Sequence, residues 1–286
     1  MTDKTFILCV GASKCGTTWI RDYLGSSPGA DMGRLGEMQV WDALTVPVFA
    51  KYRVPEPSRW RQWEDRAAQA LGWAPKADVL RWRLQSDVNV YFAYFQRLLA
   101  KPGIHLTGDV TPTYAALPVP ILQRIDDRFT AAGITVKVVF IMRDPIERAW
   151  SLVKMKQRKG ETAQAPREQL FRAQFGDQPL APHHAYGPTL ARLNAVFEPE
   201  RVFLGLYETL FEPETIAAFS AFAGVPSRPE AGGKRVNAAG DSSGVPEALA
   251  AEVYPNFASD YAAAFTAVPQ ARTLWRHARA AEASVK

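Results

Sequence analysis

Short apolar runs alternate with longer amphipathic stretches along this chain. Four runs predict β-strands, at Thr5–Val10, Ile104–Gly108, Val136–Met142 and Val202–Tyr207. The run 136–142 is apolar at nearly every position, which is typical of a strand buried on both faces. Helical patterns follow these runs at about 17–26, 118–132, 145–158, 188–197 and 213–223. Strands separated by helices predict a parallel sheet with right-handed crossovers and helices on both faces.

The alternation is interrupted between residues 41 and 103. Five of the eight tryptophans lie in this stretch: Trp41, Trp60, Trp63, Trp73 and Trp82. Ser58 precedes two of them and predicts a helix that begins with a serine cap. Two interpretations stay open, because a helical insertion can pack its aromatic rings into a core or present some of them to a substrate pocket.

Composition narrows the class of protein. The chain has 286 residues, 47% of them apolar, which is enough for a sizeable core. Its net charge of +5 and pI near 9.2 suit anionic ligands, but no concentrated basic stripe indicates a nucleic-acid partner. Cys9 and Cys15 do not suggest a disulfide framework and fit a reducing compartment. With no pattern of a signal peptide or a membrane span, we expect a cytoplasmic protein.

The most informative segment follows the first predicted strand and reads Gly11-Ala-Ser-Lys14-Cys15-Gly16-Thr17-Thr18. Its two glycines permit a tight turn into a helix that begins near Thr17, and the backbone amides of residues 15 to 18 can hold one phosphate there. The nucleotide-triphosphatase pattern G-x-x-x-x-G-K-[ST] differs, because it has lysine at the position of Thr17. Lys14 instead precedes the second glycine by two residues, which predicts a donor shorter than a triphosphate.

A second candidate element begins where the strand 136–142 ends. Arg143 follows this strand, and Pro145 lies where a helix can start. Ser151 falls about two helical turns later, so that Arg143 and Ser151 can contact one oxyanion. Two interpretations stay open, an ion pair of Arg143 with Asp144 or Glu147 and a second phosphate subsite, and the first loop favours the second.

Three of these segments are expected to meet. Gly11, Asp109 and Arg143 each follow a predicted strand, and parallel sheets bind ligands outside the carboxyl ends of their strands. We therefore expect a P-loop-like, three-layer α/β/α fold with a central parallel sheet and a helical, aromatic-rich insertion at about 41–103. Residues 1–286 are expected to form a single domain.

The two phosphate motifs together resemble those of a known family. Gly-x-x-Lys-x-Gly-Thr-Thr after a first strand, with strand-Arg-Asp-Pro-x-x-Arg-Ala-x-Ser downstream, is similar to the sulfotransferases that use 3′-phosphoadenosine 5′-phosphosulfate (PAPS). The resemblance implies a 5′-phosphate site formed by Lys14, Cys15, Gly16, Thr17 and Thr18. It also implies that Arg143 and Ser151 hold the 3′-phosphate and that Trp19 packs on the adenine.

The resemblance extends over roughly residues 5 to 265 through looser motifs. The segment 36–42 resembles the carbohydrate and bacterial branches, in which the residue at Glu37 is the catalytic base. Tyr207 corresponds to a tyrosine near the adenine, and Lys234 with Arg235 to a basic loop over the 3′-phosphate. The segment 108–114 also matches. The chain departs from the family at Gly36, Gln39 and Val110, where members often have lysine, histidine and, in some, a catalytic lysine.

The function that this resemblance implies is sulfuryl transfer without a metal. PAPS donates the group to a hydroxyl or amine of an acceptor such as a sugar, a lipid-linked sugar or a small metabolite, and adenosine 3′,5′-bisphosphate is released. Glu37 takes the acceptor's proton and Lys14 stabilises the leaving phosphate. The alternatives are a P-loop kinase or triphosphatase with Asp109 as its magnesium ligand, and a non-catalytic nucleotide-binding protein. The acceptor and the oligomeric state stay open.

Overall fold

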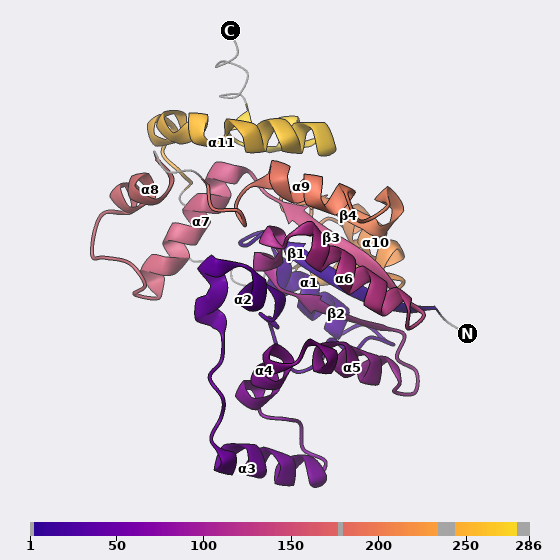
Figure 1. The fold of residues 1–286 in the computed structure, drawn as a ribbon. Helices are drawn as coiled ribbons and strands as arrows, with labels where there is room; N and C mark the ends of the chain where they lie inside the picture. Colours follow the sequence, from indigo (N-terminus) through magenta and orange to yellow (C-terminus); the bar gives the residue numbers. More distant parts are fainter. Residues whose placement is uncertain (1–2, 177–179, 234–243, 279–286) are drawn as a thin grey trace.

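The computed structural model describes residues 3–176, 180–233 and 244–278, and these residues form a sheet of four parallel strands (Figure 1). The strands are β1 (Lys4–Gly11), β2 (Leu106–Val110), β3 (Ile134–Met142) and β4 (Val202–Leu206). Their order across the sheet is β2-β1-β3-β4. All four predicted strands are confirmed, and the two central ones, β1 and β3, have the continuous buried runs expected inside a parallel sheet.

Helices connect the strands at the predicted places. The five predicted helices are confirmed as α1 (Thr17–Gly25), α6 (Val119–Thr130), α7 (Pro145–Arg158), α9 (Tyr186–Asn194) and α10 (Pro213–Ala223). The apolar pattern did not predict α8 (Arg167–Phe175), α11 (Glu247–Ala267) and α12 (Ala271–Leu274). Short 3-10 helices are η2 (Pro112–Ala116), η3 (Pro199–Arg201) and η4 (Pro229–Gly233).

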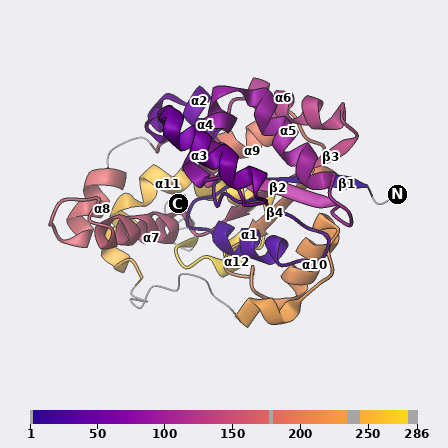
Figure 2. The same ribbon diagram turned by 90° about the horizontal axis from the view of Figure 1, so that it is seen from below.

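The helices form two layers around the sheet (Figure 2). Phe6 of β1 packs against Phe95 and Phe129 on one face, with ring centroids 4.8 and 4.1 Å apart. On the other face Phe203 of β4 packs against Phe219 of α10 at 5.3 Å. Figure 2 shows α1 and α10 on this second side, and α6 and α9 on the first. The predicted three-layer α/β/α arrangement is therefore confirmed.

The insertion consists of helices that extend away from the sheet. It contains α2 (Trp41–Thr45), η1 (Pro47–Tyr52), α3 (Arg59–Ala70), α4 (Ala77–Ser86) and α5 (Val88–Leu99). Ser58 caps α3 as predicted, since its hydroxyl accepts a hydrogen bond from the Arg61 N–H at 3.2 Å. Figure 1 shows α3 at the far end of the insertion, while α5 lies close to the sheet.

Four of the five tryptophans of the insertion fall into two groups, and the fifth, Trp82, is half-buried. Trp41 is 1% exposed and packs edge-on against Tyr91 at 5.3 Å, so it belongs to the core. Trp60, Trp63 and Trp73 are 69%, 58% and 71% exposed. The core interpretation therefore holds for Trp41. The three exposed rings pack into no core, and α3, which carries Trp60 and Trp63, lies far from the sheet.

We expect this division to appear in stability measurements. Trp41→Ala should lower the free energy of unfolding by about 3–5 kcal/mol, because it leaves a large cavity in a packed core. Trp60→Ala should lower it by no more than about 1 kcal/mol, because this exposed ring stacks only on Trp63 in the described structure. Urea unfolding monitored by circular dichroism measures both values. Equal losses in the two variants would contradict the assignment of Trp41 to the core.

The predicted position of Asp109, just after the end of a strand, is wrong. Asp109 does not follow a strand but lies inside β2, because β2 pairs with β1 as far as Val110 opposite Cys9. Its carboxylate is fully buried and accepts hydrogen bonds from the Thr111 hydroxyl at 2.6 Å and the Tyr91 hydroxyl at 3.0 Å. Burial raises its pKa to about 7. Asp109 therefore ties β2 to the insertion and does not face the edge where ligands bind.

Other predictions about the chain stay open. Within residues 3–176, 180–233 and 244–278, no helix is both long enough and apolar enough to cross a bilayer. Cys9 and Cys15 are both buried and unpaired. The cytoplasmic location and the single domain over residues 1–286 stay predictions.

Candidate active site

The order of the strands creates a crevice between β1 and β3. β1 pairs with β2 on one side and with β3 on the other, so the direction of strand addition reverses at β1. At such a reversal the loops after β1 and β3 lie on either side of a ligand site. Gly11, predicted to follow the first strand, is the last residue of β1, so the loop after β1 begins at Ala12, and Arg143 follows β3 directly. The Ala12 N–H donates to the Ile141 carbonyl at 2.9 Å, which holds the two segments together. The two predicted phosphate elements therefore meet at this crevice.

The loop after β1 leads into the open N-terminus of α1. Gly16 is the N-cap residue of α1, no side chain caps it, and the first turn holds no acidic residue. The first amides of a helix have no intrahelical acceptor and carry partial positive charge, so Thr17 and Thr18 can donate to an anion here. The Cys15 N–H instead donates to the Ala12 carbonyl at 3.2 Å and closes the turn. Of the four predicted amides, that of Cys15 is thus already used.

Gly16 allows a second segment to pack on this loop. Its φ of +83° is unfavourable for other residues, and a Cβ atom would lie 2.5 Å from Leu210 Cδ2. The same Cβ would lie 3.4 Å from the ring of Tyr207. The absence of a side chain at Gly16 therefore lets the turn after β4 lie against the phosphate loop, which brings the predicted site residue Tyr207 next to it.

Lys14 lies among other cations. Burial, followed by the charges of Arg158, Arg143 and Lys159, lowers the pKa of its ammonium group below the usual value. Arg158 ends α7 and Lys159 follows it, so the last turn of this helix faces the loop. Cations that repel one another across a crevice are stabilised when an anion binds between them. The electrostatics of the loop therefore favour a phosphate or sulfate group.

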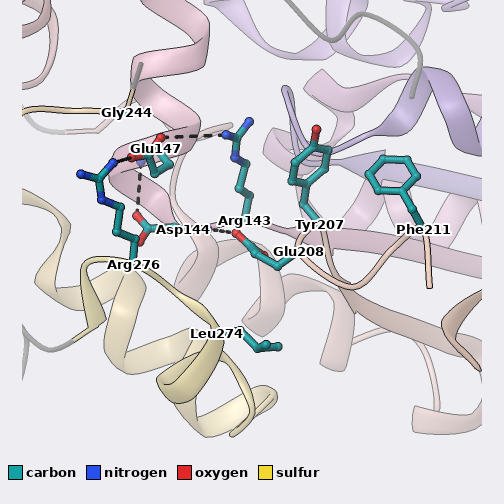
Figure 3. A pocket seen from close by; sticks show the side chains of 9 residues that line it. All are labelled: Arg143, Asp144, Glu147, Tyr207, Glu208, Phe211, Gly244, Leu274 and Arg276. Atoms are coloured by element: carbon teal, nitrogen blue, oxygen red, sulfur yellow. Dashed lines mark hydrogen bonds and ion pairs between the residues drawn. The ribbon is translucent and has the colours of Figure 1, made fainter. Parts of the chain in front are cut away.

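A pocket of about 370 Å³ opens beside Arg143 (Figure 3). Its charged lining consists of Arg143, Asp144, Glu147, Glu208 and Arg276. Tyr207, Phe211 and Leu274 supply an apolar part of the wall. The Arg143 guanidinium lies over the Tyr207 ring at 4.6 Å. The pocket therefore has an apolar part and a charged part in which two arginines lie beside three carboxylates. A nucleotide has a comparable division into a base and charged phosphates.

Arg143 is fixed through its backbone, while its guanidinium is bound only loosely. The Tyr186 hydroxyl donates to the Arg143 carbonyl at 2.7 Å and accepts from the Arg143 N–H at 3.2 Å. The nearest carboxylate oxygen, Glu147 Oε2, is 4.0 Å from the guanidinium. The predicted ion pair with Glu147 exists at this long distance, so the donors of Arg143 remain available for a ligand. Ser151 lies half-buried on α7, and its contact with a phosphate stays a prediction.

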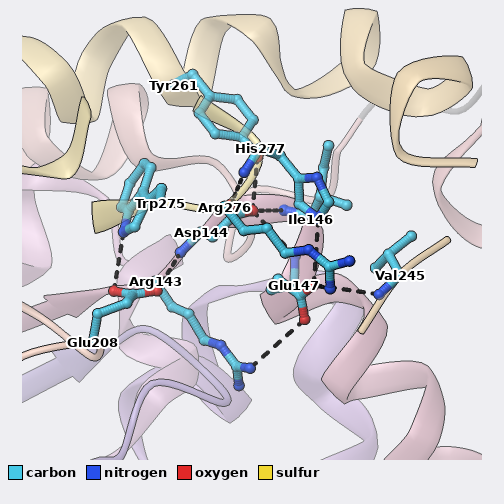
Figure 4. Close-up of polar contacts among 10 residues, drawn as sticks. All are labelled: Arg143, Asp144, Ile146, Glu147, Glu208, Val245, Tyr261, Trp275, Arg276 and His277. Atoms are coloured by element: carbon cyan, nitrogen blue, oxygen red, sulfur yellow. Dashed lines mark hydrogen bonds and ion pairs between the residues drawn. The ribbon is translucent and has the colours of Figure 1, made fainter. Parts of the chain in front are cut away.

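The C-terminal segment forms one wall of this pocket (Figure 4). Asp144 caps α7 by accepting from Ile146 N–H, and its second oxygen accepts from His277 N–H at 2.9 Å. Glu208 accepts from Trp275 Nε1 at 3.0 Å and from the Asp144 N–H at 3.1 Å. The sequence motifs included Asp144 and Glu208 but gave no role to residues 275–277. No local pattern marks them, since their partners lie far away in the sequence.

Glu37 is held by the insertion and by the end of β2. The Arg81 guanidinium on α4 donates to the Glu37 carbonyl at 2.9 Å, and Gln39 Nε2 donates to the Glu37 carboxylate at 3.3 Å. Thr111 accepts the Met38 N–H at 3.0 Å. Burial and then the charge of Asp42 raise the pKa of Glu37. A raised pKa makes a carboxylate a stronger base, which suits the predicted role. The sequence did not indicate Arg81, and it included Thr111 in the matching segment 108–114 without giving it this role.

Charged neighbours connect the surroundings of Lys14 and Glu37. Lys159, which lowers the pKa of Lys14, forms an ion pair with Glu161 at 3.6 Å. Burial and then the charges of nearby acids, Glu37 and Glu161 among them, raise the pKa of Tyr52. Lys14 thus lies near the end of α7, and Glu37 lies near Tyr52 of the insertion.

The other predicted donor residues are placed as follows. Trp19 is 4% exposed, stacks on Tyr23 with centroids 4.8 Å apart and donates from Nε1 to the Ala231 carbonyl at 3.1 Å. Its edge contacts Phe211, the ring that lines the pocket. Contact of Trp19 with an adenine stays a prediction. Lys234 and Arg235 lie outside the described residues.

Comparison with solved structures shows where this fold occurs. No protein-family model matches the sequence, and no curated protein matches it. A sulfotransferase from Alicyclobacillus acidocaldarius superposes with a TM-score of 0.59 at 21% identity, over 93% of this chain and 96% of that one. The sulfotransferase domain of the curacin biosynthetic pathway gives a TM-score of 0.48 at 19% identity, over 84% of this chain and 81% of that one. A sulfotransferase domain of the Synechococcus PCC 7002 olefin synthase gives 0.48 at 19% identity, over 88% of each chain. The chain thus has the P-loop-like α/β fold of a bacterial sulfotransferase.

Proposed function

We propose that this protein transfers a sulfuryl group from PAPS to a hydroxyl or amine of a small acceptor. The observation that carries the proposal is the meeting of two elements suited to anions at the crevice between β1 and β3. One is the uncapped start of α1 with Lys14, and the other is the pocket beside Arg143. A nucleotide with a phosphate on each side of its ribose needs both elements, together with an apolar wall for its base.

The residues present fit such a donor. The start of α1 is open to an oxyanion, because no side chain caps it and its first turn holds no acidic residue. Cys15 points its thiol inward, 3.7 Å from the Ser13 carbonyl. Arg143, pinned by Tyr186, presents its guanidinium to the pocket for the 3′-phosphate. When bound, PAPS supplies an activated sulfuryl group on its 5′-phosphate.

The chemistry needs one base and one cation from the protein. Glu37 takes the proton of the acceptor hydroxyl as the acceptor oxygen forms its bond to sulfur. Lys14 stabilises the negative charge on the 5′-phosphate oxygen as its bond to sulfur breaks. The products are a sulfate ester and adenosine 3′,5′-bisphosphate. The proposed step uses no magnesium ion, since charge is released on one phosphate oxygen beside the ammonium group of Lys14.

The environment of Asp109 argues against a P-loop kinase or triphosphatase. Such an enzyme needs an ionised carboxylate at the end of a strand to hold magnesium. Asp109 is buried, accepts hydrogen bonds from Tyr91 and Thr111, and has a pKa raised to about 7. Lys14 also precedes the position from which a triphosphatase lysine reaches its phosphates.

Ligand-induced stabilisation tests the donor. Adenosine 3′,5′-bisphosphate at about 100 times its Kd should add about 2.7 kcal/mol of stability, which raises the Tm by several degrees. ATP with magnesium should raise the Tm far less, because the phosphate loop and the pocket beside Arg143 each offer a subsite for one of two separate phosphates. Differential scanning fluorimetry measures both shifts. A response to ATP with magnesium and none to the bisphosphate would overturn the assignment.

The acceptor follows from a transfer assay. We propose a sugar, a lipid-linked sugar or another small hydroxyl metabolite, on the similarity of segment 36–42 to the carbohydrate and bacterial branches. Incubation with ³⁵S-labelled donor and panels of these classes identifies the acceptor by the labelled product. Binding of the bisphosphate without transfer to any class would favour a non-catalytic nucleotide-binding protein.

We also propose a cytoplasmic location, since the unpaired thiols of Cys9 and Cys15 suit a reducing compartment.

A further inference from the structure

Two arginines from distant parts of the chain line the pocket beside β3. Arg143 follows β3 directly, and Arg276 lies in the C-terminal segment after α12. Figure 3 shows the carboxylate of Glu147 between their two guanidinium groups. Glu147 Oε1 is 3.4 Å from Arg276, and its Oε2 is 4.0 Å from Arg143. One negative group in this pocket can therefore lie next to both arginines.

The residues on either side of Arg276 anchor this segment to the core. Trp275 is 3% exposed and donates to Glu208, and the backbone N–H of His277 donates to Asp144 (Figure 4). The guanidinium of Arg276 itself packs over Gly244, where a Cβ atom would collide with it. The backbone of Arg276 is therefore fixed while its charged end lies at the pocket, half exposed.

The acidic residues of the pocket are mostly engaged with its walls. Asp144 is 1% exposed and accepts from Tyr261 at 2.7 Å and from His277 N–H at 2.9 Å, besides capping α7. Glu208 accepts from the Asp144 N–H and from Trp275. Only Glu147 lies against the two guanidinium groups. Burial raises the pKa of Glu147, but hydrogen bonds from His277 and the Val245 N–H and the charge of Arg143 outweigh it, so the pKa falls below its usual value. Glu147 thus shows that the two arginines, His277 and the Val245 N–H hold one anionic group at this place.

A purely structural role explains Arg276 less well. Its ion pair with Glu147 is long and half exposed, and pairs of this kind contribute little to stability. Trp275 and His277 already fix the segment through buried contacts. What Arg276 adds is a second guanidinium that faces the same space as Arg143, and arginine pairs of this kind suit phosphate groups.

We propose that Arg276 binds the second phosphate of the donor nucleotide together with Arg143. Arg276 then distinguishes a nucleotide with a 3′-phosphate from one with a 5′-phosphate alone. This inference rests on the proposed function, since it assigns a residue to the same donor site. It adds a specificity residue that no sequence motif indicates.

Calorimetric titration with two nucleotides tests the inference. Adenosine 3′,5′-bisphosphate and adenosine 5′-monophosphate differ only in the phosphate at issue. Arg276→Gln should weaken binding of the bisphosphate by about 10- to 100-fold, the range for a lost hydrogen bond to a charged group, and leave the monophosphate unchanged. The affinity of Arg276→Lys for the bisphosphate should fall between those of the wild type and Arg276→Gln, since lysine keeps the charge but lacks the planar guanidinium group. Arg272→Gln on α12 is the matched control, because Arg272 stacks over Phe265 outside the pocket lining, and it should change neither affinity.

A second variant displaces the side chain of Arg276 without removing its charge. Gly244→Ala places a Cβ atom against the Arg276 guanidinium and displaces it, so it should reproduce the selective loss. Equal weakening of both nucleotides, or unchanged bisphosphate binding in Arg276→Gln, would overturn the inference but leave the proposed function intact. A wild-type protein that binds neither nucleotide would overturn both.

Discussion

Replacing Glu37 by glutamine is expected to lower kcat by about 10²- to 10⁴-fold, the usual contribution of a general base. Glutamine keeps the size of the side chain and its contact with Gln39, but it cannot take a proton from the acceptor. The donor site does not include Glu37, so binding of the bisphosphate should not change. The measurement is the rate of labelled product formation with the acceptor that the wild-type enzyme uses. Turnover within a few-fold of wild type would show that another group is the base.

The pH profile separates a base from a structural carboxylate. Burial and the neighbouring Asp42 raise the pKa of Glu37. Below that pKa the carboxyl group is protonated and cannot accept a proton, so kcat/KM should fall on an acid limb that lies above the ordinary value of about 4.3. In Glu37→Gln this limb should disappear. A limb that persists at the same pH in the variant would assign it to another residue.

Replacing Lys14 by methionine is expected to lower kcat by about 10²- to 10³-fold. Methionine fills the space of the lysine stem, but it leaves the charge on the departing phosphate oxygen without a cation. Only the protonated amine is effective, and burial followed by the charges of Arg158, Arg143 and Lys159 lowers its pKa. Activity should therefore decline on an alkaline limb below pH 10.5, the ordinary pKa of a lysine.

Lys101→Met is the matched control for this effect. Lys101 is exposed, pairs with Asp31 at 2.6 Å and lies at the opposite end of the sheet, before β2 begins. Its loss should leave kcat unchanged. An equal decline in both variants would mean that overall charge, and not Lys14, governs the rate.

The sequence predicted the sheet and the first half of the site because both depend on local patterns. Continuous apolar runs specify strands buried on both faces, as in 136–142, and the glycine spacing around Lys14 specifies a turn into a helix. These features need contacts only between residues near one another in the chain. Asp109 was misplaced because strand pairing with β1 extends β2 beyond the end of its apolar run.

Side-chain environments could not be read in the same way. Trp41 and Trp60 look alike in the sequence, yet one is buried against α5 and the other is exposed on α3. Which of them is buried depends on where each helix packs, and that is set by the whole fold. The support of Glu37 by Arg81 likewise joins two segments that no spacing rule connects.

The sequence by itself determined the parallel α/β architecture and the phosphate loop with its displaced lysine, since strand patterns and tight turns are encoded over a few neighbouring residues. Only the tertiary structure decided what surrounds Arg143. The packing of the C-terminal segment on Asp144 and Glu208 brings Arg276 to a pocket formed by residues far earlier in the chain. Such long-range convergence depends on the summed packing of many elements, so no local pattern of residues encodes it.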